Sequence, residues 1–197
     1  MPMNLPNLLT LSRIVAIPLV IFTFYLPPPV GPWSGVVLFA LAGVTDWLDG
    51  QLARRWNQQS SWGRVLDPIA DKLLVATILF MLAALQRITP VTVFPALVIL
   101  AREILVSGLR EHLAMLHVPL PVSRLAKWKT GIQMIAIGVL MVGDSGPVTI
   151  PVRTFGEALL WIAAVLTIVT GYDYLRAGMT HIGAADAPKA AKPGTAP

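Results

Sequence analysis

Six apolar segments, each close to the length that crosses a bilayer, make up most of this 197-residue chain. A membrane-spanning helix needs about 20 consecutive, mostly apolar residues. Connections rich in proline and glycine separate the segments, as expected for turns between helices. Because backbone polar groups inside a bilayer must be satisfied within each segment, the sequence predicts an all-α integral membrane protein. Its six transmembrane helices are expected at roughly 8–26, 33–54, 63–86, 92–115, 124–143 and 154–176.

The composition agrees with this fold class. Hydrophobic residues make up 55% of the chain and charged residues only 13%, whereas soluble domains carry about 25% charged residues. The chain has no cysteine, which excludes disulfides, thiolate metal sites and thiol catalysis. We therefore expect one membrane domain over residues 1–177, followed by a disordered tail rich in alanine and proline over residues 178–197.

The distribution of basic residues predicts the orientation of the helices. With the N-terminus placed in the cytoplasm, eleven lysines and arginines fall on the cytoplasmic side, and two, Arg87 and Arg153, fall on the opposite side. Cytoplasmic loops of membrane proteins carry an excess of basic residues, so both termini are expected to be cytoplasmic. The net charge of +5 suits anionic lipids and phosphates better than nucleic acid, because the basic residues lie at the ends of apolar segments.

Four aspartates lie where the second and third apolar segments approach the cytoplasm. Asp46 and Asp49 are three residues apart, and Asp67 and Asp71 are four apart, so each pair shares one helix face. The connection between the two segments is short, and the four carboxylates are expected to converge. Unpaired negative charges at that depth are very unfavourable, which predicts a bound cation. An all-oxygen site suits hard divalent cations, and Mg²⁺ commonly also takes up substrate phosphates.

Two other interpretations of these aspartates remain open. They could pair with Lys72, Arg102 or Arg54 and only hold helices together, or they could line the path of a divalent-cation transporter. The off-centre position and the lack of an internal repeat count against a transporter. Gly50 and Ala53 share the aspartate face, where small residues allow either close helix packing or space for a nucleotide.

The complete motif resembles the signature of the CDP-alcohol phosphatidyltransferase family. It reads Asp-x₂-Asp-Gly-x₂-Ala-Arg-x₈-Gly-x₃-Asp-x₃-Asp from Asp46 to Asp71. Three more stretches, NLPNLLTLSR, AREILVSGLRE and KWKT, are similar to bacterial members that make phosphatidylglycerophosphate. Together these similarities cover most of the chain before the tail.

The resemblance implies an enzyme of phospholipid biosynthesis. It would transfer the phosphatidyl group of CDP-diacylglycerol to sn-glycerol 3-phosphate, giving phosphatidylglycerophosphate and CMP. The resemblance further implies a six-helix fold, a homodimer and two divalent cations, Mg²⁺ or Mn²⁺. The location would be the bacterial inner membrane, in contact with membrane lipid, with the active site facing the cytoplasm.

The resemblance also implies roles for individual residues. Asp46, Asp49, Asp67 and Asp71 would hold the metals. Asp71 would in addition act as general base on the acceptor hydroxyl, because a primary alcohol is a poor nucleophile at neutral pH. The CDP-lipid pocket would be formed by Asn7, Thr10, Arg13, Gly50, Ala53, Arg54, Ser60 and Gly63.

The acceptor carries a phosphate dianion, so its pocket needs fixed cations. The candidates in and beside the fourth and fifth segments are Arg102, Arg110, Lys127 and Lys129. Alternatively, these side chains anchor the helices at the membrane surface, and Arg102 pairs with Glu103 or an aspartate. Inositol phosphate, serine and phosphatidylglycerol remain alternative acceptors, although so basic a pocket favours a phosphorylated one.

Overall fold

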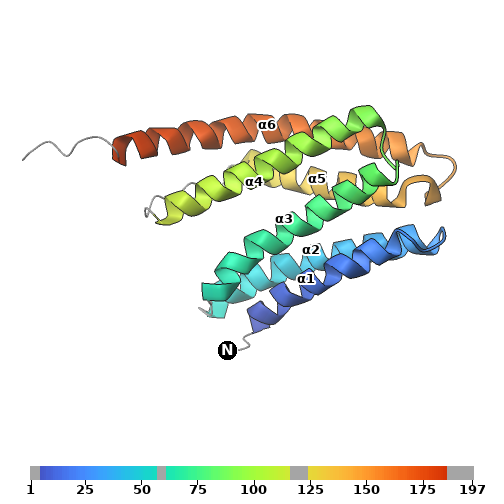
Figure 1. Cartoon of the computed structure of the whole chain (residues 1–197), viewed down its shortest axis with the longest axis horizontal. Coiled ribbons are helices and arrows are strands. Elements are labelled where there is room, and N and C mark those ends of the chain that lie inside the picture. Colours follow the sequence, from blue (N-terminus) through green and yellow to red (C-terminus); the bar gives the residue numbers. More distant parts are fainter. Residues whose placement is uncertain (1–4, 57–60, 116–123, 186–197) are drawn as a thin grey trace, which may run out of the picture.

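The computed structural model describes residues 5–56, 61–115 and 124–185; within these ranges the side chains of residues 5–9, 47, 49–56, 61–65, 67 and 180–185 are not described. The described residues form six α-helices and two short 3₁₀ helices (Figure 1). The elements are α1 (Leu5–Thr23), α2 (Val30–Trp56), α3 (Ser61–Ala84), η1 (Pro90–Thr92), α4 (Val93–Met115), α5 (Arg124–Val142), η2 (Gly143–Ser145) and α6 (Val152–Ala185).

Each predicted apolar segment corresponds to one α-helix, and most boundaries differ by a few residues. The all-α prediction is thus confirmed for the described residues. The largest difference is at α6, which continues to Ala185 and makes residues 178–185 helical rather than part of the tail. Residues 178–185 contain no proline, which would interrupt a helix, and the first proline of the tail is Pro188. Residues 186–197 lie outside the described residues, where disorder stays a prediction.

The helices pack in two groups of three. In one group α1 packs against α2 and α3, and in the other α6 packs against α4 and α5. Contacts of α2 with α5 and of α3 with α4 join the groups. Successive helices run in opposite directions, so α1 begins at the same end of the bundle at which α6 ends (Figure 1). The start of α1 and the end of α6 therefore lie at one end of the bundle, and η1 and η2 lie at the other.

The outer surface of the bundle has the character of a membrane protein. Three segments, Pro90–Met115, Arg124–Ser145 and Val152–Met179, are long and apolar enough to cross a bilayer. Shorter apolar stretches cover Thr10–Thr23 and Val30–Asp46. Large apolar side chains are widely exposed on the helices, which is unfavourable in water and favourable in lipid.

The apolar core fills the half of the bundle that lies away from the N-terminus. Its fully buried side chains come from both helix groups and include Ile78, Leu82, Ile99, Ile137, Leu140 and Leu160. The α5 helix ends where Gly143 adopts a φ of 49°, a left-handed conformation that favours glycine. The cavities lined by Asp46, Asp71 and Glu103 lie in the other half of the bundle.

Glu157 on α6 fastens the connection before α4 at the end of the bundle away from the N-terminus. Its carboxylate accepts hydrogen bonds from the Thr89 backbone N–H at 2.8 Å and from the hydroxyls of Thr89 and Thr92 at 2.9 Å each. Arg153 Nε also lies 3.4 Å from this carboxylate. One acceptor thus satisfies donors from both the connection and α6.

We predict that Glu157→Ala lowers the free energy of unfolding by about 1–3 kcal/mol, because several donors then lose their shared acceptor. The measurement is equilibrium unfolding of the purified protein in detergent micelles. Thr154→Ala, an exposed position on the same helix turn, is the matched control and should unfold like the wild type. Equal stability of the two variants would contradict this role of Glu157.

Candidate active site

Two of the predicted metal ligands meet at one arginine. Arg13 of α1 is 1% exposed. Its Nη1 atom lies 2.9 Å from Asp46 Oδ1 on α2 and 2.7 Å from Asp71 Oδ1 on α3. Side chains of α1, α2 and α3 therefore meet at one point. Thr10, one turn before Arg13, is also buried.

The arrangement fits a site for a hard cation. The carboxylates of Asp46 and Asp71 both reach one nitrogen atom, so they converge on a small volume, and both supply oxygen donors. Asp49 and Asp67 belong to α2 and α3, three and four residues from Asp46 and Asp71, and their part in the site stays a prediction. Among the side chains that the structure describes, no group of three potential metal ligands occurs.

Arg13 pairs with both described aspartates, a contact that the sequence did not suggest. Of the partners that it did suggest, Lys72 pairs with Glu103, and Arg102 contacts Glu103 and Thr170; pairing with Arg54 stays a prediction, because the Arg54 side chain is not described. Several predicted site residues cannot be compared in this way. Ser60 lies outside the described residues, and the side chains of seven others are not described: Asn7, Asp49, Gly50, Ala53, Arg54, Gly63 and Asp67.

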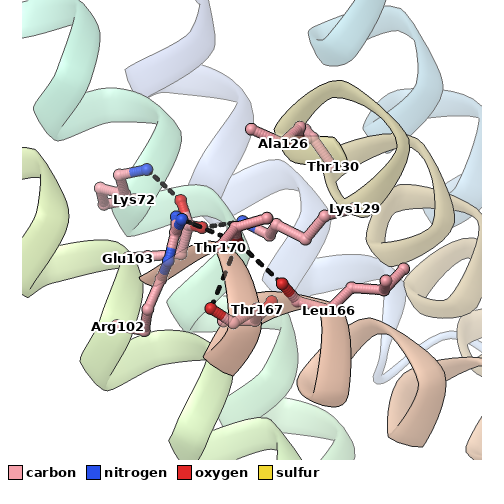
Figure 2. A network of polar contacts seen from close by, with 9 residues as sticks. All are labelled: Lys72, Arg102, Glu103, Ala126, Lys129, Thr130, Leu166, Thr167 and Thr170. Atoms are coloured by element: carbon pink, nitrogen blue, oxygen red, sulfur yellow. Dashed lines mark hydrogen bonds and ion pairs between the residues drawn. The ribbon is translucent and has the colours of Figure 1, made fainter. Parts of the chain in front are cut away.

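Glu103 of α4 is the centre of a second polar cluster, shown in Figure 2. Its two carboxylate oxygens accept hydrogen bonds from Lys72 of α3 and Lys129 of α5. The Lys129 side chain is only 3% exposed, and that of Glu103 is 13% exposed. Arg102 Nη1 lies 3.4 Å from the same carboxylate. One carboxylate therefore lies beside positive charges from three helices, of which that of Lys129 is buried.

Arg102 is held against α6 by three separate contacts. Its Nη2 atom donates to Thr170 Oγ1 at 2.9 Å, and its guanidinium carbon lies 5.5 Å from the ring centre of Tyr174. Between these two residues, a Cβ added to Gly171 would come within 3.0 Å of Arg102 Cγ. The lack of a side chain at Gly171 thus lets the arginine lie directly on the helix. The residues that position the guanidinium are thus on α6, about 100 residues after the aspartates in the sequence.

Two adjoining cavities connect these clusters. The first, of about 210 Å³, extends from Arg13, Asp46 and Asp71 to Lys72 and Glu103. The second, of about 200 Å³, also contacts Lys72 and Glu103, and its other polar lining residues are Arg102, Ser107, Arg110, Lys129, Thr130 and Tyr174. A carboxylate pocket and a strongly basic pocket therefore share a wall. A substrate that carries an anionic group and a reactive hydroxyl could bridge them.

The four basic residues predicted for the acceptor have different environments. Arg102 and Lys129 line the second cavity and are largely enclosed, and Arg110 lines it from an exposed position. Lys127 is exposed and is not among the lining residues of either cavity; its role stays a prediction. The sequence did not indicate Lys72 as a binding-site residue, and it indicated Glu103 only as a possible partner of Arg102. Both are charged residues within apolar segments, which is the feature that could have marked them as functional.

We predict that Glu103→Gln destabilises the protein by about 3–5 kcal/mol, because a neutral amide leaves the buried Lys129 ammonium without a counter-charge. Adding Lys129→Met removes that charge and should restore part of the stability. Unfolding of the single and double variants in micelles measures this coupling. Lys127→Met, an exposed lysine on the same helix, should restore nothing. Additive effects of Glu103→Gln and Lys129→Met would rule out the buried pair.

Comparison with known proteins identifies the family. A family model described as CDP-alcohol phosphatidyltransferase matches residues 3–169. A protein of Rickettsia bellii is 52% identical over 174 residues, which cover 88% of this chain and 94% of the relative. A Rickettsia typhi protein is 49% identical, covering 90% of this chain and 98% of the relative. A Cereibacter sphaeroides protein is 38% identical, covering 91% and 97%.

All three relatives carry the name "CDP-diacylglycerol--glycerol-3-phosphate 3-phosphatidyltransferase". The family match includes α1 to α5 and the first half of α6, and so contains the whole lining of the first cavity and all of the second except Tyr174. The resemblance that the aspartate motif indicated is thereby confirmed. This chain belongs to the CDP-alcohol phosphatidyltransferase family.

Proposed function

We propose that this protein transfers the phosphatidyl group of CDP-diacylglycerol to sn-glycerol 3-phosphate, producing phosphatidylglycerophosphate and CMP. The structural observation that carries the proposal is the shared wall between the aspartate pocket and the basic pocket. The first suits the activated lipid, and the second suits an anionic acceptor. The names of the relatives support glycerol 3-phosphate over inositol phosphate, serine or phosphatidylglycerol as the acceptor.

The aspartate pocket would hold the CDP-lipid together with two divalent cations, Mg²⁺ or Mn²⁺. Asp46, Asp49, Asp67 and Asp71 would be the ligands, a proposal supported by the convergence of Asp46 and Asp71. Bound cations would neutralise the pyrophosphate and stabilise the charge that develops on the leaving CMP. Arg13 holds both described carboxylates in place and supplies a positive charge beside the same phosphates.

The basic pocket would hold the phosphate of the acceptor. Arg102 and Lys129 offer enclosed donors, and Arg110 and Lys72 line the same cavity. Arginine suits this task because its planar guanidinium can donate two parallel hydrogen bonds to a phosphate. The contacts of Arg102 with Thr170 and Tyr174 fix its guanidinium before the acceptor arrives. A fixed guanidinium loses little conformational freedom on binding.

In the proposed reaction, Asp71 removes the proton from the primary hydroxyl of the acceptor. The freed oxygen attacks the phosphorus atom that bears the diacylglycerol, and a new phosphorus–oxygen bond forms. The bond between that phosphorus and the CMP oxygen breaks, and CMP leaves with the bonding electrons. Asp71 lines the first cavity directly beside Lys72, which lines both. A base at that position can meet a hydroxyl that enters from the basic pocket.

We also propose that all six helices cross the inner membrane of a bacterium, with both termini in the cytoplasm and the active site facing it. The bacterial origin of the relatives supports a bacterial membrane. The proposed outer end contains Arg87 and Arg153, which bind backbone oxygens of Phe24 and Gln86 there. As the family resemblance implies, the protein would act as a homodimer.

The test of the function is acceptor-dependent release of CMP from CDP-diacylglycerol by purified protein in lipid micelles. We expect release with glycerol 3-phosphate in Mg²⁺ or Mn²⁺, and none with inositol phosphate, serine or phosphatidylglycerol. A chelator should abolish it, and either cation should restore it. Release with another acceptor would overturn the assigned substrate, and full activity in the chelator would overturn the metal site.

We predict that Asp71→Asn lowers kcat by about 10²–10⁴-fold while CDP-diacylglycerol still binds, because the amide cannot accept the hydroxyl proton. Turnover and binding of the CDP-lipid are measured separately over a wide range of Mg²⁺ concentration. Recovery of turnover at high Mg²⁺ would assign Asp71 to metal binding alone. Wild-type turnover at ordinary Mg²⁺ would exclude it as the base.

A further inference from the structure

A buried amide lies in the wall of the aspartate cavity without a hydrogen-bond partner for its oxygen. Gln133 is on α5, is 3% exposed and lines the cavity of about 210 Å³. Its Oε1 atom is fully enclosed and has no hydrogen-bond partner among the residues that the structure describes. A buried acceptor left in this state costs about 1–3 kcal/mol. Such a group in a cavity wall points to a ligand that donates a hydrogen bond.

The other polar groups in the wall of this cavity already have partners. The carboxylate oxygens of Glu103 accept from two lysines. Asp46 and Asp71 share an arginine nitrogen, and the Thr130 hydroxyl donates to the Ala126 carbonyl at 3.1 Å. Within the described lining, the Gln133 side-chain oxygen is thus the fully enclosed acceptor that has no hydrogen-bond partner. Its natural partner is a neutral donor such as a hydroxyl, because the amide carries no charge.

We propose that Gln133 accepts a hydrogen bond from the secondary hydroxyl of the three-carbon acceptor and thereby selects for it. The proposal rests on the proposed function. Lys129 and Gln133 are four residues apart on the buried face of α5, which separates them by about 6 Å along the helix. In this arrangement the phosphate of the acceptor binds Lys129 and its primary hydroxyl faces Asp71. The secondary hydroxyl on the middle carbon then lies beside Gln133.

This contact would make the enzyme specific for glycerol 3-phosphate against acceptors that have the same phosphate and primary hydroxyl but lack the middle hydroxyl. A site built to bind a hydroxyl rejects the analogue without it, because its own buried acceptor is then left unpaired. The relevant analogue is 3-hydroxypropyl phosphate. It keeps the charge and both ends of the acceptor and removes one hydrogen-bond donor.

The experiment compares kcat/KM for glycerol 3-phosphate and 3-hydroxypropyl phosphate by CMP release, with full-length enzyme in micelles. We expect the wild type to favour glycerol 3-phosphate by about 10-fold or more. Gln133→Met, which keeps similar volume without the acceptor, should lose activity mainly with glycerol 3-phosphate, so that the ratio approaches 1. The ratio is taken within one preparation and does not depend on how much of the enzyme is folded.

Thr167→Val is the matched control. Thr167 Oγ1 is also buried without a partner among the described residues, but it is on α6 and outside the lining of both cavities. This variant should keep the wild-type ratio. If Gln133→Met is inactive, the shorter amide of Gln133→Asn serves in its place and should give an intermediate ratio.

Two results would overturn the proposal: a wild-type ratio below about 3-fold, or a wild-type ratio in the Gln133 variants, including the case in which activity falls equally with both acceptors. Failure of the proposed function looks different, because the wild type would then release no CMP with glycerol 3-phosphate at all.

Discussion

The ion pairs of Glu103 with Lys72 and Lys129 are the interaction on which the functional half of the bundle depends. Charges enclosed among apolar helices are unfavourable unless they are paired and hydrogen-bonded. The same carboxylate joins α3, α4 and α5 and stands in the wall of both cavities. A group that stabilises the helix packing therefore also sets the distance between the aspartate pocket and the basic pocket.

One half of the bundle contains the apolar core, and the other contains the two polar cavities. In one half, side chains such as Ile78, Ile137 and Leu160 leave no exposed surface and hold the helix groups together. In the other, the helices keep cavities between them, and charged side chains fill the contacts. The stability that this apolar core gives to the fold offsets the unfavourable free energy of keeping ionisable groups partly desolvated nearby. Preorganised charges in such a site act strongly on a substrate because little water screens them.

The sequence predicts those parts of the site that depend on spacing along one helix or across a short connection. Helical periodicity and the short connection between α2 and α3 predict that four aspartates converge, and the two that the structure describes, Asp46 and Asp71, contact the same arginine. The pairing of Glu103 with lysines 31 and 26 residues away depends instead on how three helices rotate about their axes. The same holds for the packing of Arg102, on α4, against α6. It also holds for Gln133, an ordinary amide in an apolar segment. No local pattern encodes these contacts.

The role of α6 shows how specificity can arise outside a family motif. The aspartate signature lies wholly in α2 and α3 and concerns the activated lipid, which resemblance assigns to the whole family. The acceptor differs among the enzymes that the sequence left open, and the basic pocket proposed for it is lined by residues of α3, α4, α5 and α6. Thr170, Gly171 and Tyr174 direct Arg102 into that pocket without carrying a charge themselves. Acceptor choice can therefore change through neutral residues on α6 and α5 while the signature and its chemistry stay the same.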